Sequence, residues 1–276
     1  MDLASLIRLA LDEDLGPGDL TTTATVAADA QGAADFRAKQ NLVLCGHAPA
    51  AEVFRQVGGI YTPLVAEGEA VAAGTVVAQV AGPLRALLSG ERLALNFLMR
   101  LSGIATHTRA VVSAADGLRV VDTRKTTPLH RALERHAVRM GGGHNHRFAL
   151  YDGILIKDNH LRAAGGVVEA VHRARASAHH LLRIEVEVAT LDELVEALEV
   201  GADAILLDNM DDPTLAEAVR LTRDHPRGAG VILEASGNMS AERLPRLAGM
   251  GLNLVSMGGL VHQARWVDLS MKLSQR

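Results

Sequence analysis

From about residue 115 onward, the chain alternates short apolar segments with longer Ala-rich segments that have a helical pattern. A polar residue and a Gly-rich or polar loop stand between each apolar segment and the helical segment that follows it. This alternation is typical of βα units, which assemble into a parallel sheet covered by helices. We therefore expect strands at 118–122, 153–157, 183–188, 204–208, 230–234 and 253–257.

One of these units has clear boundaries. A predicted helix over 192–200 is followed by Gly201, a residue that commonly ends helices, and the next apolar strand begins almost at once. The predicted strands are too few for the eight of a complete TIM barrel. The expected fold is therefore α/β, with an incomplete, open α/β barrel over 113–265.

The first part of the chain has a different pattern, in which short strands precede one long helix. We expect residues 1–112 to form an N-terminal α+β sandwich domain. The chain end alternates like a strand, and 266–276 is predicted to return to that domain. The expected elements of the domain are strands at 36–39, 42–44 and 68–80 and a helix at 90–109.

Composition indicates a large core packed from small aliphatic residues, because 48% of the 276 residues are hydrophobic and only 3% are aromatic. The single cysteine, Cys45, cannot form an internal disulfide, which favours a reducing compartment. The N-terminus begins with an acid and lacks the apolar run of an export signal, and no segment is typical of a membrane span. We expect a cytoplasmic protein that does not enter a membrane.

Positive charge is concentrated in one segment. The formal net charge of −4 argues against nonspecific nucleic-acid binding. Residues 119–147, however, hold seven Arg or Lys against two acids, a local charge of +5 that leaves −9 for the rest. Arg131, Arg135 and Arg139 are spaced by four and indicate an exposed helix face, whereas the remaining cations favour an anionic ligand.

Charged residues also stand at the ends of the predicted strands. In 184–188 the apolar positions alternate with Glu185 and Glu187, so both carboxylates share the face opposite the helices. Lys157, Asp208 and Glu234 each follow a run of apolar residues. The carboxyl ends of parallel strands form the functional end of a barrel, so we expect these groups to converge there. A structural network of ion pairs is the alternative, above all for Glu185 and Glu234.

Two Gly-rich loops follow the last two predicted strands. They contain Ser236 and Gly237 in the first case and Gly258 in the second. Barrels commonly bind phosphate at these loops, where small residues let backbone N–H groups approach the oxygens. A third glycine stretch, 141–147, carries His146 and Arg147 and is predicted to hold a substrate.

Motifs over nearly the whole chain resemble one known family. In the second half they are 122–128 (DTRKTTP), 141–147 (GGGHNHR), 155–160 (LIKDNH), 185–188 (EVEV), 206–209 (LLDN) and 234–237 (EASG). In the first half they are 13–16 (EDLG), 18–22 (GDLTT), Glu91-Arg92 and Leu95-Asn96. Together they resemble the quinolinate phosphoribosyltransferases, which are type II phosphoribosyltransferases.

The resemblance implies an α/β domain followed by an incomplete α/β barrel, in a homodimer or a dimer-based hexamer whose sites are shared between subunits. The implied reaction is a pentosyl transfer of de novo NAD biosynthesis. It joins quinolinate to phosphoribosyl pyrophosphate and releases nicotinate mononucleotide, pyrophosphate and CO2, with Mg2+ as the cofactor. Both substrates are small polyanions, which agrees with the basic segment.

The resemblance also implies roles for single residues. Arg124, His146 and Arg147 hold the carboxylates of quinolinate, with Lys157 between the two substrates. The catalytic residues are then Lys157, Glu187 and Asp208, of which Glu187 and Asp208 hold Mg2+ indirectly, through pyrophosphate or water. Substrate binding further involves Arg92 of the partner subunit, Lys125 at the phosphates of the sugar donor, and Ser236, Gly237, Gly258 and His262 at its 5′-phosphate.

The sequence departs from the family pattern at two loops. Leu129-His130 replaces the usual Gly-Leu after Pro128, and Asn238 stands where the family has a second glycine. Asn tolerates left-handed backbone better than most residues, so we expect the second loop to keep its conformation.

Three alternative functions remain open. A molybdenum-utilisation paralogue of the same fold departs from the family at 157–160, which is intact here. A Schiff-base aldolase would use Lys157 as a nucleophile beside a phosphate site. A noncatalytic anion-binding protein would bind quinolinate without turnover.

Overall fold

The computed structural model describes residues 2–274, whose contacts group them into two compact units. The units interleave along the chain, and 126–142 belongs to the first unit in addition to the chain end that the sequence predicted to return to it. The boundaries at 112 and 265 stay a prediction. The first unit comprises the chain up to residue 109, 126–142, and the chain from 260 onward; the second comprises 110–125 and 143–259.

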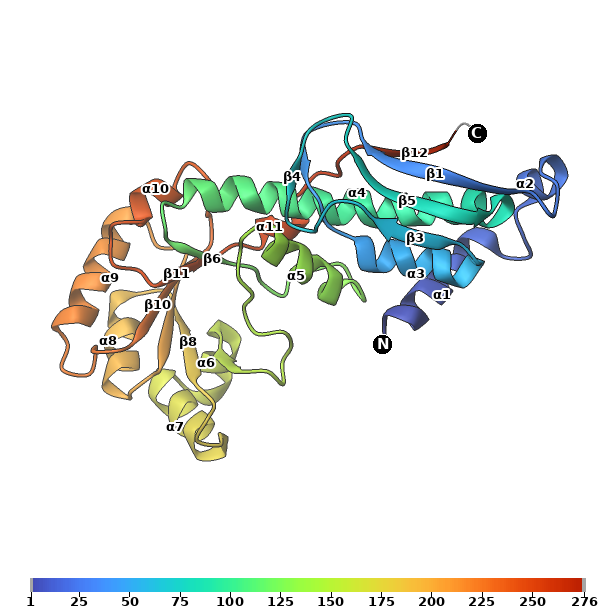
Figure 1. Cartoon of the computed structure of the whole chain (residues 1–276). Helices are drawn as coiled ribbons and strands as arrows, with labels where there is room; N and C mark the ends of the chain where they lie inside the picture. The colour runs from blue at the N-terminus through green and yellow to red at the C-terminus, as the bar shows by residue number, and fades with distance from the viewer. Residues whose placement is uncertain (1, 275–276) are drawn as a thin grey trace. The chain divides into compact units, whose positions relative to one another are not determined.

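Six parallel strands form the sheet of the second unit, in the order β6-β11-β10-β9-β8-β7 (Figure 1). The predicted parallel pairing is confirmed for every neighbouring pair. Within residues 2–274, β6 and β7 are the outer strands of this sheet, and a bridge between Val121 and His144 is the one pairing beyond β6, so the barrel is open as expected. The strands are β6 (Arg119–Val121), β7 (Ile154–Ile156), β8 (Ile184–Val188), β9 (Ala204–Asp208), β10 (Ile232–Ser236) and β11 (Leu254–Ser256).

Helices connect these strands on the chain, and α7, α8 and α9 follow one another around the sheet (Figure 1). Their local sequences explain their boundaries. At the start of α8, the Thr190 side chain accepts a hydrogen bond from the N–H of Glu193, and Gly201 follows its end with φ +76°. The helices are α6 (Asp158–Ala164), α7 (Val167–Ser177), α8 (Leu191–Glu199), α9 (Asp212–Asp224) and α10 (Leu244–Leu247).

One strand is shifted from its predicted place. β10 begins and ends two residues later than the predicted 230–234, because Ala235, which is fully buried, continues its apolar run. Glu234 therefore lies inside the strand rather than at its end. This shift moves the Glu234 carboxylate deeper into the sheet interior than the sequence suggested.

The first unit has a four-stranded antiparallel sheet in the order β12-β1-β5-β3. The last strand, β12 (Leu269–Leu273), pairs with β1, so the chain end does return to the N-terminal sheet. The predicted strand 68–80 is wrong as one element, because a turn at Gly74 (φ +91°) divides it. The other strands are β1 (Gln31–Ala38), β2 (Leu42–Val43), β3 (Ile60–Pro63), β4 (Ala70–Val71) and β5 (Val76–Pro83).

The core of the first unit lies between this sheet and its helices. Phe36 from β1 and Phe54 from α3 are fully buried, and their rings meet edge to face with centroids 5.8 Å apart. Leu87 and Leu98 of α4 complete this cluster. The helices are α1 (Leu3–Leu15), α2 (Leu20–Thr25), α3 (His47–Val57), α4 (Leu84–Ala114), α5 (Arg131–Met140) and α11 (Gly259–His262); α4 extends the predicted helix 90–109 at both ends.

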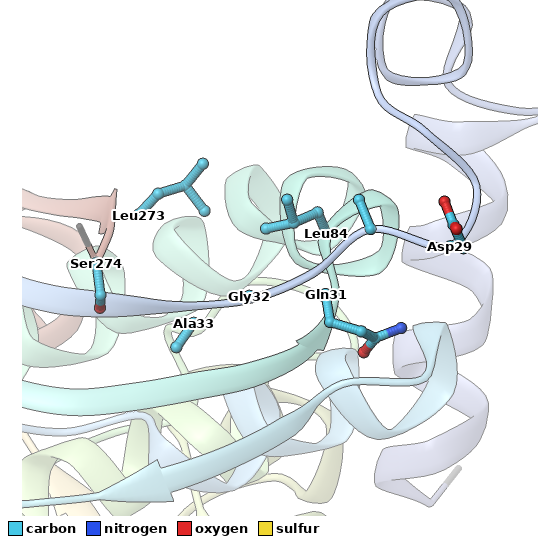
Figure 2. A pocket seen from close by; sticks show the side chains of 8 residues that line it. Asp29, Gln31, Gly32, Ala33, Leu84, Leu273 and Ser274 are labelled. Atoms are coloured by element: carbon cyan, nitrogen blue, oxygen red, sulfur yellow. The ribbon is translucent and has the colours of Figure 1, made fainter. Parts of the chain in front are cut away.

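A hollow of about 700 Å3 lies at one end of the antiparallel sheet (Figure 2). Gly32 of β1 faces Leu84 there, and a Cβ on this glycine would lie only 2.4 Å from Leu84 Cδ2. The lining carries one charged side chain, Asp29, and mostly small or aliphatic residues. It therefore lacks the convergent charges of a site for ionic substrates, although it is larger than the cavity described next.

Within residues 2–274, no helix combines the length with the apolar character that crossing a bilayer would require.

Candidate active site

A cavity of about 540 Å3 lies at the carboxyl ends of the parallel strands, entirely within the second unit. The loops after β6 and β7 and the ends of β8 to β11 all contribute to its wall. Most of the predicted site residues come together here, although their individual roles stay predictions. Those that line the cavity are Arg124, Lys125, His146, Arg147, Lys157, Glu187, Asp208, Ser236 and Gly237.

Cationic side chains from three separate segments meet in this cavity. Arg124 and Lys125 follow β6, Arg147 lies in the segment before β7, and Lys157 follows β7 directly. Burial, together with the nearby Arg124 guanidinium, lowers the pKa of Arg147 from its usual value, although it stays charged at neutral pH. Arg147 Nη1 also donates to the carbonyl of Gly153 at 2.8 Å, which fixes its side chain. Such a cluster attracts a polyanion.

Lys157 pairs with Glu187 across the neighbouring strands β7 and β8. The side chain of Glu187 is only 12% exposed, whereas that of Lys157 is 45% exposed. The alternation of β8 produces this arrangement, because Ile184, Val186 and Val188 are buried on its other face. The ammonium group therefore reaches the cavity while it remains held by a carboxylate.

His146 lies between two carboxylates that the sequence had directed to the sheet interior. Its Nε2 is 3.2 Å from Glu185 and 3.3 Å from Glu234. Burial lowers the pKa of His146, but the two carboxylates more than offset this and raise it to about 10. The N–H of Arg147 donates to Nδ1 at 2.7 Å. This contact favours the neutral ring with its proton on Nε2, so it opposes the rise in pKa that the two carboxylates cause.

The sequence left open whether Glu185 and Glu234 serve a ligand or form a structural network of ion pairs. Burial raises the pKa of Glu185, an effect that His146 opposes and Glu234 reinforces. Within the described residues, Glu234 Oε1 is buried and has no hydrogen-bond partner. The pair therefore forms an interior network around His146, and Glu234 also lines the cavity, whose wall includes Glu187 and Asp208.

The fully buried carboxylate of Asp122 organises the segment that carries the histidine. Its Oδ1 accepts from the N–H of His146 at 2.9 Å, and its Oδ2 accepts from Asn145 Nδ2 at 2.5 Å. A parallel bridge between Val121 and His144 joins the two stretches of backbone just before these contacts. Sequence analysis did not single out Asp122, although an acid at the end of an apolar strand was the available signal.

The loop after β10 has the backbone expected of it. Gly237 and Asn238 are both left-handed, with φ +82° and +48°, so the expectation that Asn238 preserves the loop is confirmed. A Cβ on Gly237 would lie 2.1 Å from Asn209 Oδ1, so no larger residue fits. Asn238 Nδ2 donates to the same oxygen at 3.1 Å. Asn209 thus supports the loop, a role that its position beside Asp208 did not reveal in the sequence.

Three predicted residues do not line this cavity. Arg92, on α4, and His262, the last residue of α11, belong to the first unit and are exposed. Gly258 lies in the second unit, directly before α11. Their roles stay predictions.

A parallel α/β sheet with a cationic cavity at the carboxyl ends of its strands defines a barrel-type protein built to hold small anionic ligands. Comparison with known proteins identifies the family of this chain. The family model of the quinolinate phosphoribosyl transferase C-terminal domain matches residues 104–272, and that of the N-terminal domain matches residues 19–102. The chain belongs to the quinolinate phosphoribosyltransferase family.

Individual relatives agree with this assignment. The chain is 41% identical over 278 residues to a probable nicotinate-nucleotide pyrophosphorylase (carboxylating) of Bacillus subtilis, covering 99% of this chain and 94% of that one. It is 40% identical over 276 residues to the human nicotinate-nucleotide pyrophosphorylase (carboxylating), covering 98% and 91%. The crystal structure of NadC from Streptococcus pyogenes superposes with a TM-score of 0.92 at 38% identity, covering 99% of this chain and 96% of that one.

Proposed function

We propose that this protein is a quinolinate phosphoribosyltransferase, also named nicotinate-nucleotide pyrophosphorylase (carboxylating). It transfers the phosphoribosyl group of phosphoribosyl pyrophosphate to quinolinate and forms nicotinate mononucleotide, pyrophosphate and CO2. The observation that carries the proposal is the convergence of Arg124, Lys125, Arg147 and Lys157 in one cavity of a chain from this family. The reaction serves de novo NAD biosynthesis, and a chain with a single cysteine, Cys45, fits a cytoplasmic location.

Quinolinate is a dianion, and the cavity offers it planar cationic groups. Arg124 and Arg147 hold its carboxylates through paired N–H donors, for which a guanidinium is better shaped than an ammonium. His146 lines the same cavity beside Arg147, with Nε2 on Glu185 and Glu234, and its contact with quinolinate stays a prediction. The half-buried Arg147 donates to the carbonyl of Gly153, so it meets the substrate in a fixed orientation and loses little entropy on binding.

Phosphoribosyl pyrophosphate occupies the other part of the site. Lys125 reaches its phosphates, while Ser236 and Gly237 bind the 5′-phosphate. The contributions of Gly258 and His262, which do not line the cavity, stay predictions. The left-handed backbone at Gly237 exposes N–H groups close to a ligand without a side chain in the way. Lys157 lies between the two substrates.

Two cavity carboxylates, Glu187 and Asp208, hold the ribose hydroxyls and the magnesium pyrophosphate. Their oxygens suit Mg2+, which prefers oxygen ligands and usually binds through one or two carboxylates, waters and substrate phosphates. Glu187 is paired with Lys157, and Asp208 accepts from Asn209 Nδ2 at 2.8 Å, so neither is a free carboxylate; this suits indirect binding through pyrophosphate or water. The ion would neutralise charge on the departing pyrophosphate.

Chemistry at the substrates requires positioning and electrostatics rather than a protein nucleophile. The ring nitrogen of quinolinate attacks the anomeric carbon as the bond to pyrophosphate breaks, and the negative charge of Glu187 and Asp208 favours the cationic sugar. The ribosylated nitrogen is then positive. It stabilises the electron pair left on the adjacent carbon when the carboxylate departs as CO2, and that carbon takes up a proton.

The assembly completes the site. We propose a homodimer, or a hexamer of such dimers, in which Arg92 of the partner subunit contributes to quinolinate binding. Closed symmetric dimers are the commonest oligomers, and a shared site makes the monomer inactive.

Two other functions are less well supported. A Schiff-base lysine acts as a neutral amine, whereas Lys157 is ion-paired with Glu187. Borohydride trapping of substrate on Lys157 would favour the aldolase, and no adduct is expected. The paralogue linked to molybdenum use differs at 157–160, where the family sequence is intact here.

The deciding experiment measures release of labelled CO2 from carboxyl-labelled quinolinate. Release should require both phosphoribosyl pyrophosphate and Mg2+. Calorimetric binding of quinolinate without any turnover would instead support a noncatalytic anion-binding protein.

A further inference from the structure

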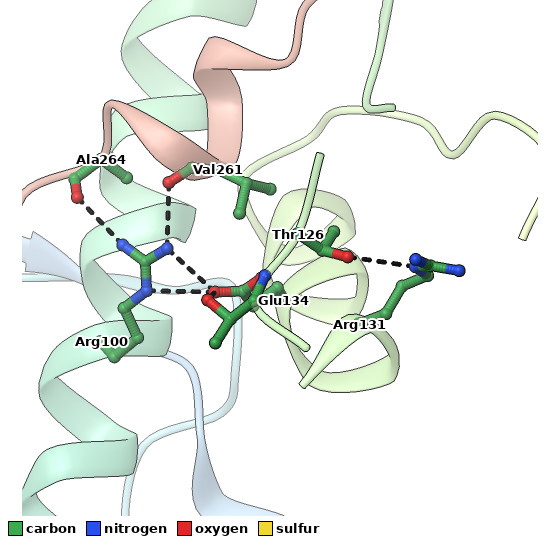
Figure 3. Close-up of polar contacts among 7 residues, drawn as sticks. Arg100, Thr126, Arg131, Glu134, Val261 and Ala264 are labelled. Carbon is green, nitrogen blue, oxygen red and sulfur yellow. Dashed lines mark hydrogen bonds and ion pairs between the residues drawn. The ribbon is translucent and has the colours of Figure 1, made fainter. Parts of the chain in front are cut away.

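A buried ion pair in the first unit connects segments that lie next to predicted substrate-binding residues. Glu134 of α5 is fully buried, and Arg100 of α4 is 17% exposed. Arg100 donates to Glu134 Oε1 through Nε at 3.2 Å and through Nη2 at 2.9 Å (Figure 3). The two helices are thereby joined by a charged contact that is largely removed from solvent.

The second set of donors to Glu134 comes from a loop rather than a helix. The N–H of Thr127 donates to Oε2 at 2.8 Å, and its hydroxyl donates to Oε1 at 2.8 Å. Glu134 therefore accepts four hydrogen bonds, three at Oε1 and one at Oε2. A carboxylate bound in this way holds both partners at fixed positions.

The remaining donors of Arg100 bind a third segment. Nη2 donates to the carbonyl of Val261 and Nη1 to that of Ala264, both at 3.0 Å. These carbonyls lie at and just beyond the end of the short helix α11 (Figure 3). A single ion pair thus ties the loop at Thr127 and the chain after α11 to the long helix α4.

The position of Thr127 in the sequence gives these contacts a functional meaning. Residues 122–127 form no helix or strand, so side-chain contacts determine the course of this stretch. Thr127 follows Lys125 by two residues and Arg124 by three. Arg131 Nε supports the same loop by donating to the Thr126 hydroxyl at 3.0 Å (Figure 3).

We infer that Arg100 and Glu134 are positioning residues that hold the loop of Arg124 and Lys125 in its substrate-binding conformation through Thr127; the inference rests on the proposed function. Stability alone does not call for such a pair, because well-packed apolar residues commonly replace a buried ion pair without loss. Glu134 accepts from both the backbone N–H and the hydroxyl of Thr127, so it fixes the conformation of one particular loop residue. It orders the loop before the substrates arrive, which lowers the entropic cost of binding.

The first test changes the carboxylate while keeping its shape. In Glu134→Gln, the amide NH2 faces either Arg100 or Thr127, both donors, so one side of the network is lost. We expect KM for both substrates to rise about 10-fold, with a smaller change in kcat. In Thr127→Val we expect KM to rise roughly 3- to 10-fold, and Thr127→Ser, which keeps the hydroxyl, should restore it.

Thr106→Val is the matched control in the same unit. The Thr106 hydroxyl accepts from the N–H of Val43 at 2.8 Å and donates to the carbonyl of Ser102 at 2.7 Å, and neither partner borders the loop. Loss of the Thr106 hydroxyl should lower the melting temperature of the protein and leave KM for both substrates unchanged. Equal KM changes in Thr106→Val and Thr127→Val would mean that Thr127 affects KM only by stabilising the fold. That result would overturn the inference.

A second readout does not depend on turnover. Hydrogen exchange of the amides in 123–127 should be faster in Glu134→Gln than in the wild type, and unchanged in Thr106→Val. Unchanged exchange in Glu134→Gln would contradict the inference whatever the enzyme activity. Absence of CO2 release by the wild-type protein would instead remove the proposed function, and the exchange comparison would still decide whether Glu134 orders the loop.

Discussion

The carboxylate of Asp122 accepts a hydrogen bond of 2.9 Å from the backbone N–H of His146, 24 residues further along the chain. This contact lies at the edge strand β6, beside the bridge between Val121 and His144. It brings the segment that carries His146 and Arg147 against the strand that leads to Arg124. The predicted quinolinate grip is thus assembled from two stretches by one buried acid.

Replacing Asp122 by Ala should therefore weaken quinolinate binding as well as the fold. The N–H of His146 would lose its acceptor in a buried setting, at a cost of about 1–3 kcal/mol in the free energy of unfolding. We expect a loss of quinolinate affinity of about 10-fold or more, because the gripping groups would lose their positions. Urea unfolding and calorimetric titration of quinolinate measure the two effects.

Asp203→Ala is the control for that experiment. Asp203 also accepts from a strand N–H, that of Ile184 at 2.8 Å, but it does not line the cavity. It should destabilise the fold and spare the affinity. An equal loss of affinity in both variants would show that Asp122 acts only through stability.

Arg124→Ala should mainly weaken quinolinate binding. A hydrogen bond to a charged group contributes about 1.5–3 kcal/mol, which corresponds to a loss of about 10- to 150-fold in affinity. Calorimetry with quinolinate alone measures this directly. Arg139→Ala, on the exposed face of α5, serves as a control for the loss of one positive charge. Wild-type-like kinetics for Arg124→Ala would refute its assigned role.

A mixture of two inactive variants tests the shared site. Arg92→Ala and Lys157→Ala subunits should each form dimers with little activity. If a site combines Lys157 of one subunit with Arg92 of the partner subunit, each mixed dimer contains one intact site. Random reassociation of equal amounts should then restore about one quarter of wild-type activity. Absence of rescue after verified subunit exchange would mean that sites are not shared in this way.

Leu129 adopts a left-handed backbone, with φ +66°, at the place where the family has glycine. This conformation costs a residue with a Cβ about 1–2 kcal/mol, and the exposed Leu129 side chain, 70% accessible, regains little by packing. Part of the gain in Leu129→Gly is lost to the greater freedom of glycine in the unfolded chain. We expect Leu129→Gly to raise the free energy of unfolding by up to about 1 kcal/mol in urea titrations.

Leu64→Gly provides the comparison for Leu129→Gly. Leu64 is 50% exposed and does not have a positive φ, so glycine relieves no backbone strain there and adds its entropic penalty to the loss of side-chain contacts. It should lose stability. A loss of the same size in Leu129→Gly would argue that the loop carries no strain.

Acid should destabilise the first unit through Glu67. Burial raises the pKa of this carboxyl, but His136 and the N–H groups of Gly46 and His47 outweigh burial and lower it to about 2, from an ordinary value of 4.5. A pKa lowered by folding gives stability that is complete above pH about 4.5 and is lost as the pH falls toward 2.

Glu67→Gln removes this titration. Its free energy of unfolding should be lower than that of the wild type at pH 7, and the difference should shrink between pH 4.5 and pH 2. Urea titrations across that range measure the difference. A constant gap between the two proteins would contradict the assignment of this acid dependence to Glu67.

The periodicity of apolar residues was sufficient to predict the parallel sheet, because each strand and helix of the second unit buries one face in a pattern of its own. Strand β8 is the clearest case: Ile184, Val186 and Val188 are buried, and Glu185 and Glu187 alternate with them. The family motifs identified most of the cavity residues. In the first unit, the single strand expected over 68–80 was wrong because apolar periodicity did not register the turn at Gly74.

Local sequence thus determined the elements and the residue types at the carboxyl ends of the strands, since both follow from side-chain alternation and turn chemistry along the chain. It did not determine how deep Glu234 lies, that Asp122 binds the backbone of His146, or that Arg100, Glu134 and Thr127 form one network. These contacts join residues between 7 and 34 positions apart. Their partners depend on how whole elements pack and on which buried polar groups must then be satisfied, and those conditions exist only in the folded chain.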